Sequence, residues 1–276
     1  MPGPEQQPDI DAGTAPPPPR TPRAGGRTST AGTALEKSLR ILEAVSAPGG
    51  PHRLTDVAAA AAVPKSSTHR ILASLAEQGY VRPAGESRYA SGPRLRALAA
   101  AVAGSEPRGV GEVLEELRRA TGQTVHLALH SGDTITYIRK LESDRPFRTA
   151  SRTGMRMPLH TTAIGKAVLA HLTDAEVAAL TGENGPAALT ARTPRSLTGP
   201  AELAAELELI RARGFAVDDE ENEPSIRCVG AAVLDPGGRP IGGVSVTTVT
   251  FLTDRAELQS YAPAVRAAAE ALAPLL

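Results

Sequence analysis

Hydrophobic residues recur every three or four positions between residues 34 and 46, and this spacing predicts an amphipathic helix. Leu35, Leu39 and Leu42 stand at positions i, i+4 and i+7, with Ile41 and Val45 beside them. A Pro- and Gly-rich segment follows and is expected to end the helix, because neither residue type favours a helix interior. The pattern therefore predicts a short helix with one apolar face.

Two further helices are predicted directly after the first. Thr55 is a suitable N-cap for a short second helix that runs through an alanine-rich stretch to Val63. Pro64 fits the first turn of a third helix, whose residues 65 to 78 contain no breaker, and Gly79 fits its C-terminal cap. Three short helices in close succession are typical of a helix-turn-helix module.

The third predicted helix has two chemically different faces. At 100° per residue, one face collects side chains that can pack against a core, namely Thr68, Ile71, Leu72 and Leu75. The opposite face collects small, polar and basic side chains, namely Lys65, Ser66, His69, Arg70 and Ala73. One face is therefore suited to packing and the other to donating hydrogen bonds.

A short basic hairpin is predicted after the third helix. Residues 80 to 82 and 88 to 89 flank a turn, and the two strands carry Arg82 and Arg88. Three helices and such a hairpin describe a winged helix-turn-helix, whose third helix enters the major groove of DNA. An ordinary helix with a solvated polar face is the alternative. The candidate DNA-binding residues are Lys65, Ser66, Ser67, His69, Arg70 and Arg88.

The rest of the chain mixes strands and helices. Residues 92 to 103 are expected to form a helix that links the basic module to a larger one. Strands that pair as hairpins, with helices between them, imply an α+β domain around a largely antiparallel sheet. The predicted strands cover residues 124–130, 134–141, 215–218, 228–234 and 240–248, and the predicted helices cover 110–120, 162–171, 174–181, 200–213 and 254–273.

Charge is distributed unevenly along the 276 residues, although 30 basic and 30 acidic side chains balance. Residues 34 to 103 hold nine basic and five acidic side chains, a net charge of 9 − 5 = +4, so residues 104 to 276 carry −4. A basic module joined to an acidic one suggests a nucleic-acid reader with a second function attached. Chance variation among so many charges is the plainer explanation.

The domain boundaries follow from these composition changes. Residues 1 to 33 contain eight of the 24 prolines and no aromatic residue, so a disordered tail is expected there. We expect a winged helix-turn-helix over residues 34–91, a linker helix over 92–108, and the larger α+β domain over 109–276.

Composition also narrows the expected location. A single cysteine rules out an internal disulfide framework and a CxxC metal cluster. No run of about 18 apolar residues is present, which argues against a membrane span. The first residues lack the basic and apolar regions of a secretory signal. We therefore expect a cytoplasmic protein, associated with the nucleoid when it is bound to DNA.

Two parts of the sequence resemble one family of bacterial transcription factors. Residues 64–72, with Leu75 and Gly79, resemble the recognition helix of the isocitrate lyase regulator (IclR) family. Residues 154–167, 218–228 and 235–247 resemble the effector-binding domain of that family. The resemblance covers roughly residues 33 to 276. It implies a two-domain α+β fold, with an N-terminal winged helix-turn-helix and a C-terminal GAF-like domain on a mainly antiparallel sheet.

The resemblance also implies where an effector would bind, with departures at two positions. Ser225 stands where the family usually has glycine and Ala232 where proline is common. The positions that match the family's pocket are Gly154, Met155, Asp218, Cys228, Ser245 and Thr247.

The residues themselves support such a pocket only in part. Ser245 and Thr247 would place two hydroxyls on one strand face, and Gly154 could expose backbone amides to a carboxylate. Solvent-facing hydroxyls and a glycine that merely turns the chain are the plainer interpretations. No aromatic residue falls in these motif stretches, so we expect a small polar ligand. Candidates are a keto or hydroxy acid, a polyol, or a ureide such as allantoate.

Catalytic and metal sites are weakly indicated. Cys228 could pair with His126, His130, His160 or His171, but a lone cysteine in an apolar strand usually packs. The sequence of residues 243–247 does not match the nucleophile elbow of hydrolases. The sequence of residues 165–167 does not match the phosphate-binding loop of nucleotide-binding proteins. The acidic residues between 218 and 223 fit no calcium loop. We therefore expect neither an enzyme, nor a metal, nor a cofactor.

The expected function is transcriptional repression of a catabolic operon. The partners would be a palindromic operator in double-stranded DNA, a small-molecule effector, and a second copy of the chain in a homodimer or a dimer of dimers. The alternative is a stand-alone GAF-like protein that binds or converts a small molecule. That alternative predicts only weak, sequence-independent association with DNA.

Overall fold

The computed structural model describes residues 33–105, 109–182 and 185–276, and the chain divides into two compact units, residues 1–103 and 104–276. The tail predicted over residues 1–33 lies outside the described residues except for Thr33. The last three residues of the predicted linker helix, 106–108, lie outside them as well. Each unit is described by itself.

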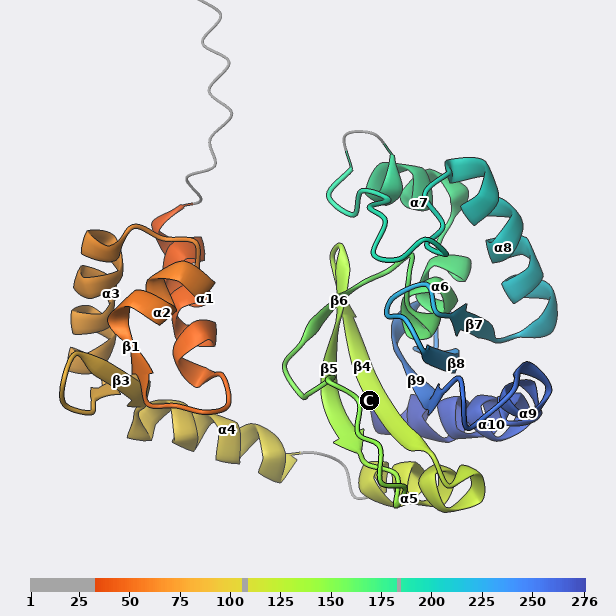
Figure 1. Ribbon diagram of the computed structural model, residues 1–276, viewed down its shortest axis with the longest axis horizontal. Helices are drawn as coiled ribbons and strands as arrows, with labels where there is room; N and C mark the ends of the chain where they lie inside the picture. The colour runs from red at the N-terminus through yellow and green to blue at the C-terminus, as the bar shows by residue number, and fades with distance from the viewer. Residues whose placement is uncertain (1–32, 106–108, 183–184) are drawn as a thin grey trace, which may run out of the picture. The chain divides into compact units, whose positions relative to one another are not determined.

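The first unit is a bundle of three helices with a small sheet (Figure 1). The sheet is antiparallel with strand order β1-β3-β2. Its elements are α1 (Ala34–Ser46), β1 (His52–Arg53), α2 (Leu54–Ala60), α3 (Lys65–Glu77), β2 (Val81–Pro83), β3 (Arg88–Ser91) and the following helix α4 (Pro93–Ser105).

Two details of this unit differ from the sequence-based prediction. The predicted two-stranded hairpin is a three-stranded sheet, because Arg53 of β1 pairs with Arg88 of β3. The chain turns from β1 directly into α2, so Arg53 is the N-cap residue. Thr55 therefore lies inside the helix, and its hydroxyl donates to Oδ1 of Asp56 at 3.2 Å instead of capping.

A small core holds α3 in place. Ile41 of α1 and Leu72 of α3 are fully buried, and Val57 of α2 and Val81 of β2 pack with them. The buried Thr68 donates its hydroxyl hydrogen to the Pro64 carbonyl at 3.1 Å, which satisfies a polar group that would otherwise be costly to bury. The apolar face of α3 is thus fixed against α1 and α2.

The second unit is built on one six-stranded antiparallel sheet with strand order β6-β5-β4-β9-β8-β7. The strands are β4 (Thr124–Ser131), β5 (Thr134–Leu141), β6 (Arg156–Pro158), β7 (Ala216–Asp219), β8 (Ile226–Leu234) and β9 (Pro240–Val249). The helices are α5 (Val110–Thr121), α6 (Ala163–Ala170), α7 (Asp174–Thr181), α8 (Pro200–Arg213), α9 (Arg255–Ser260) and α10 (Ala262–Leu272), followed by a 3-10 turn, Ala273–Leu275.

The two faces of this sheet pack against different helices (Figure 1). Val244 and Val246 of β9 join Val229 of β8 in a core with α5 and α10. Ser245 and Thr247, which alternate with those valines, point to the opposite face, where α6 packs on β8 and β9. The alternation within β9 therefore separates an apolar face from a polar one.

Two predictions for this unit were wrong in detail. The helix predicted over residues 254–273 is split at Tyr261, because Pro263 has no N–H to bond the carbonyl of residue 259. The edge strand β6 was not predicted, since three residues are too few to show alternation. None of the helices in the described residues is long and apolar enough to cross a membrane.

We predict that Gly165→Ala destabilises the second unit, because the added Cβ would lie 2.3 Å from the Leu159 carbonyl oxygen. Relieving this backbone contact should cost on the order of 1 to 3 kcal/mol in the free energy of unfolding. The matched control is Gly111→Ala in α5, where no heavy atom lies within 4 Å. The control should stabilise by up to about 1 kcal/mol. Denaturant unfolding of both variants tests this, and equal effects would contradict it.

Candidate DNA-binding helix and ligand cavity

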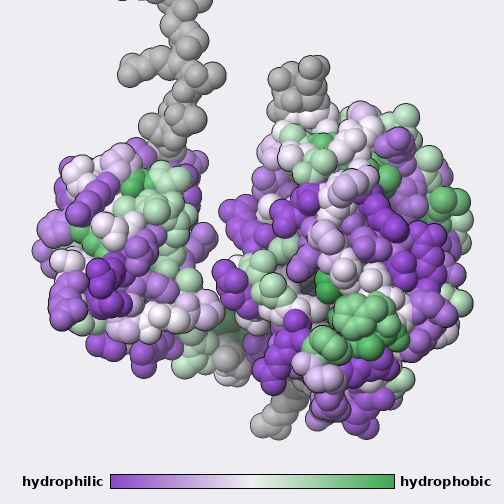
Figure 2. All heavy atoms as spheres, in the orientation of Figure 1, coloured by the Kyte–Doolittle hydropathy of each residue, from purple (hydrophilic) through white to green (hydrophobic). Residues whose placement is uncertain are grey.

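The polar face predicted for α3 is open to solvent. Lys65, Ser66, His69 and Arg70 are exposed, Ser67 is half-buried, and Thr68 and Leu72 on the opposite face are buried. Hydrophilic residues predominate over the side of this unit where α3 lies (Figure 2). The helix thus presents hydrogen-bond donors and positive charge from a rigid support, which is the arrangement that reading a DNA groove requires.

The basic side chains of the small sheet differ in how far they are exposed and in whether they are hydrogen-bonded within the unit. Arg88 is half-buried and its Nη1 donates to the Pro51 carbonyl at 3.1 Å, so part of its guanidinium is engaged within the unit. Arg82 of β2 and Arg53 of β1 are exposed. Sequence reasoning did not include Arg53 among the candidates, because the strand that carries it was not predicted.

A buried cavity of about 70 Å³ lies on the polar face of the large sheet, beneath the start of α6. Five of the six predicted effector-binding residues line it, namely Met155, Asp218, Cys228, Ser245 and Thr247. Gly154 does not. Its φ of 88° turns the chain, and its N–H donates to the Tyr137 carbonyl at 2.7 Å, so this amide is not free for a ligand.

Strand register explains how residues distant in sequence meet at the cavity. Asp218 of β7 pairs with Cys228 of β8, and Cys228 pairs with Thr247 of β9. Directly paired residues in antiparallel strands have side chains on the same face. One row across three strands therefore provides a carboxyl, a thiol and a hydroxyl. Ser245 pairs with His126 of β4, which places the imidazole on the same face.

A chain of hydrogen bonds connects these groups. The hydroxyl of Thr247 lies 3.3 Å from Cys228 Sγ and 3.2 Å from His126 Nδ1. The other ring nitrogen of His126 lies 2.8 Å from the Ser151 hydroxyl. Burial, together with the nearby Lys140 ammonium, lowers the pKa of His126 to about 3, so the imidazole is neutral.

Sequence reasoning missed several residues of the cavity wall. His126 was considered only as a catalytic partner, and Tyr137, Ser151 and Thr162 were not considered. The motif stretches contain no aromatic residue, but Tyr137, which lies outside them, lines the cavity, and its ring centroid lies 4.5 Å from that of His126. A register between β4 and β5 would have found Tyr137, since it pairs with Ala128.

Two acidic groups of the cavity have pKa values above their ordinary range. Burial, together with the negative charge of Glu221, raises the pKa of Asp218 to about 7. Burial also raises the pKa of the Cys228 thiol well above its ordinary value, and the neighbouring Asp218 contributes. Thiolate is the nucleophilic form of cysteine, so this environment disfavours nucleophilic catalysis by Cys228.

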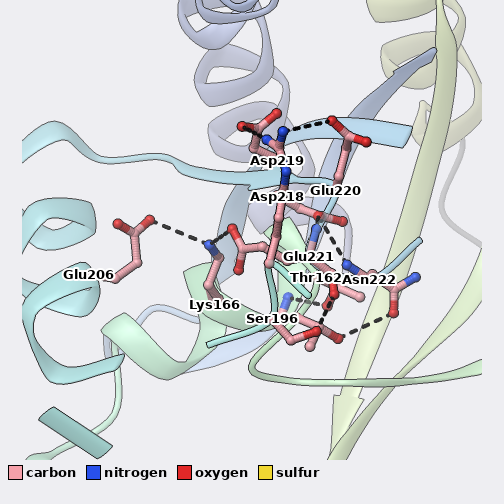
Figure 3. A network of polar contacts seen from close by, with 12 residues as sticks. Thr162, Lys166, Ser196, Glu206, Asp218, Asp219, Glu220, Glu221 and Asn222 are labelled. Carbon is pink, nitrogen blue, oxygen red and sulfur yellow. Dashed lines mark hydrogen bonds and ion pairs between the residues drawn. The ribbon is translucent and has the colours of Figure 1, made fainter. Parts of the chain in front are cut away.

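A buried ammonium group anchors the acidic loop behind the cavity (Figure 3). Lys166 of α6 is 1% exposed, and its Nζ lies 2.5 Å from Glu221 Oε1 and 3.5 Å from Glu206 Oε1 of α8. The backbone N–H groups of Glu221 and Asn222 donate to Asp218 Oδ1 at 2.8 and 3.3 Å. Lys166 thus fixes the loop that orients Asp218.

The two departures from the family pattern have different structural settings. Ser225 adopts a φ of 64°, a left-handed conformation that costs a non-glycine residue about 1 kcal/mol and that explains a preference for glycine there. Ala232 lies within β8 and does not line the cavity. Within the described residues, no group of three His, Cys, Asp or Glu side chains is arranged to hold a metal ion.

Comparisons with known proteins agree in both units. The family model described as IclR helix-turn-helix domain matches residues 34–85, and that described as Bacterial transcriptional regulator IclR C-terminal matches residues 108–273. This chain belongs to the IclR family. It is 34% identical over 246 residues to the HTH-type transcriptional regulator XynR of Escherichia coli K12, a match that covers 88% of this chain and 96% of that protein.

Two further matches to IclR-family proteins each extend over most of the chain. Identity to the transcriptional repressor IclR of Escherichia coli K12 is 30% over 242 residues, covering 86% of this chain and 87% of that protein. The crystal structure of the Thermotoga maritima IclR matches with a TM-score of 0.66 and 32% identity, over 87% of this chain and 97% of that one. This member of the IclR family is therefore a DNA-binding transcriptional regulator. Neither of the two matching family models is described as catalytic.

We predict that Asp218 makes the stability of this IclR-family protein fall as pH rises from 3.8 to about 7. In that window the native state keeps a proton that the unfolded chain has released, so raising the pH favours unfolding. Asp218→Asn cannot titrate and should make the decline shallower. Denaturant unfolding across this window measures the slope. Asp144→Asn, at a side chain that is 89% exposed, is the control. An unchanged slope in Asp218→Asn would show that the carboxyl is not held protonated.

Proposed function

We propose that this protein is a repressor that binds a palindromic operator through α3 and responds to a small polar metabolite in the cavity. The observation that carries the proposal is α3 itself. Its donor face is exposed while its opposite face is anchored in the core. Lys65, Ser66, Ser67, His69 and Arg70 would contact base edges and phosphates, and Arg88 with its exposed neighbour Arg82 would contact the backbone.

Repression is favoured by the names of the relatives. The Escherichia coli relative is named a transcriptional repressor, and a Salmonella typhimurium relative, 30% identical, is named the acetate operon repressor. For this chain we infer control of genes for the catabolism of the bound metabolite. Release from DNA requires that the ligand bind the DNA-free form more tightly, since a ligand with equal affinity for both forms shifts nothing.

The cavity favours a ligand with several hydrogen-bonding groups. Its walls offer Ser245 and Thr247 hydroxyls, a neutral His126 and the carboxyl of Asp218, and a volume of about 70 Å³ admits only a small molecule. One water molecule needs about 10 to 15 Å³ of such a cavity volume, which sets the scale. A keto or hydroxy acid, a polyol or a ureide such as allantoate fits this chemistry, with Met155 and Cys228 supplying less polar contacts.

Self-association is expected from exposed leucines on the first unit. Leu35 and Leu39 lie on one side of α1, and Leu98 lies on α4, with exposed fractions of 68%, 50% and 49%. Apolar side chains of this size gain from burial against a second copy. A palindromic operator needs two recognition helices held about one DNA turn apart, which a homodimer or a dimer of dimers supplies.

We predict that Arg70→Ala weakens operator binding by about 1 to 3 kcal/mol and relaxes base preference, because an Arg contact to a base edge is lost. Arg152→Ala is the matched control, since it removes the same charge from an exposed loop of the second unit. Fluorescence anisotropy with the upstream DNA of the gene, and with a scrambled duplex, measures both effects. Full operator affinity in Arg70→Ala would refute this placement of α3. Weak, sequence-independent binding by the wild type would support the stand-alone sensor instead.

We also predict that Leu98→Glu weakens self-association by about tenfold or more, because a charged carboxylate replaces an apolar contact. Leu209→Glu on α8 is the control, at a leucine that is 57% exposed and lies in the second unit. Analytical ultracentrifugation at micromolar concentration should show a dimer or tetramer for the wild type and the control. A wild type that is only monomeric would refute the proposal, as would an unaffected Leu98→Glu.

A further inference from the structure

A surface cleft and the ligand cavity of the second unit lie next to each other at Arg192. A surface cleft of about 620 Å³ lies beside the edge strand β6, and the buried ligand cavity lies on the sheet face. Two residues line both of them, Met157 of β6 and Arg192 of the segment before α8. Met157 is buried and Arg192 is exposed. Arg192 therefore lies where the open cleft borders the more enclosed cavity.

The backbone N–H of Arg192 donates to Ser196 Oγ at 2.9 Å, and its guanidinium makes one hydrogen bond of its own to the part of the chain that the structure describes. Its Nε donates to the Asn222 carbonyl at 3.2 Å, and Asn222 belongs to the acidic loop that lines the cavity. Within the described residues, no ion pair involves its guanidinium, whereas Arg156 in the same cleft faces Asp133 at 3.4 Å. Four of the five N–H donors of an arginine lie on its Nη atoms, so most of the N–H groups of Arg192 are available to bind a ligand.

Arg192 is also the one cationic side chain on the cavity wall among the described residues, because His126 is neutral. The buried ammonium groups nearby already have carboxylate partners. Lys140 lies 2.9 Å from Glu142, and Lys166 lies 2.5 Å from Glu221. An uncommitted guanidinium at the mouth of a cavity favours an anionic group there, since Arg binds carboxylates through two parallel hydrogen bonds.

We infer that Arg192 determines the charge specificity of the ligand site, and that the ligand is a monocarboxylic acid entering from the cleft beside β6. The inference rests on the proposed ligand-responsive function. The carboxylate binds Arg192 at the mouth, and the rest of the molecule points inward to Ser245, Thr247 and Asp218. A second carboxylate at the inner end would lie beside Asp218, and the ionised form of Asp218, which is present near pH 7, would repel it. Polyols and neutral ureides lack the group that Arg192 binds.

The test compares acids with their neutral amides on the full-length protein. Glycolate, lactate, pyruvate and glycerate, each beside its amide, are titrated by thermal shift and calorimetry up to about 10 mM, which would fill even a site of roughly millimolar affinity. In the wild type, at least one acid should bind about tenfold more tightly than its amide. Arg192→Gln should abolish that preference, and Arg192→Lys should retain part of it.

Arg195→Gln is the matched control. Arg195 is exposed on the same segment and pairs with Asp219, but it does not line the cavity, so the preference for the acid should persist. A preference that survives in Arg192→Gln, or an amide that binds as well as its acid, overturns the inference. Failure of all four acids to bind also overturns it when the wild type still binds its operator. Loss of specific operator binding by the wild type would instead count against the proposed function.

Discussion

The second unit depends on the burial of one ammonium group inside a helix that is itself wholly buried. Every residue of α6 is buried, and Lys166 in its middle is 1% exposed. A charge in such a place must be paired, because an isolated buried ion costs several kcal/mol. Glu221 and Glu206 meet it from opposite sides. The helix can therefore pack on the sheet only when the acidic loop and α8 are both in position.

This requirement links the packing of α6 to the geometry of the cavity. Gly230 lets α6 approach β8 closely, since a Cβ there would lie 3.1 Å from Ala163. The same close approach brings Lys166 within reach of Glu221, and the backbone of Glu221 holds Asp218. The carboxyl that lines the cavity is thus positioned by a charge pair behind it. A ligand that hydrogen-bonds to Asp218 therefore meets a carboxyl group whose orientation is already fixed by the core.

Sequence patterns predicted the elements with strong local signals. The bounds of α7 and α8 agree with the prediction, because Thr173 forms a capping box, Pro200 begins α8, and Gly214 ends it in a left-handed conformation. The edge strands β1 and β6 were missed, because two or three residues gain their structure from pairing with distant strands. The wall residues His126 and Tyr137 were missed for the same reason. Their place depends on strand register, which one sequence does not show.

The hydrogen-bonded side chains of the cavity can exchange donor and acceptor roles, and a bound ligand can determine which role each one takes. A neutral imidazole donates through one ring nitrogen and accepts through the other, and a hydroxyl can do either. The chain from Cys228 through Thr247 and His126 to Ser151 can therefore run in both directions with the same heavy-atom positions. A ligand group that accepts at Thr247 requires one tautomer of His126, and a group that donates there permits the other. Because the cavity is buried, a ligand that leaves either end of the chain unpaired loses affinity. Selectivity among small polar molecules then follows from their pattern of donors and acceptors more than from their apolar area.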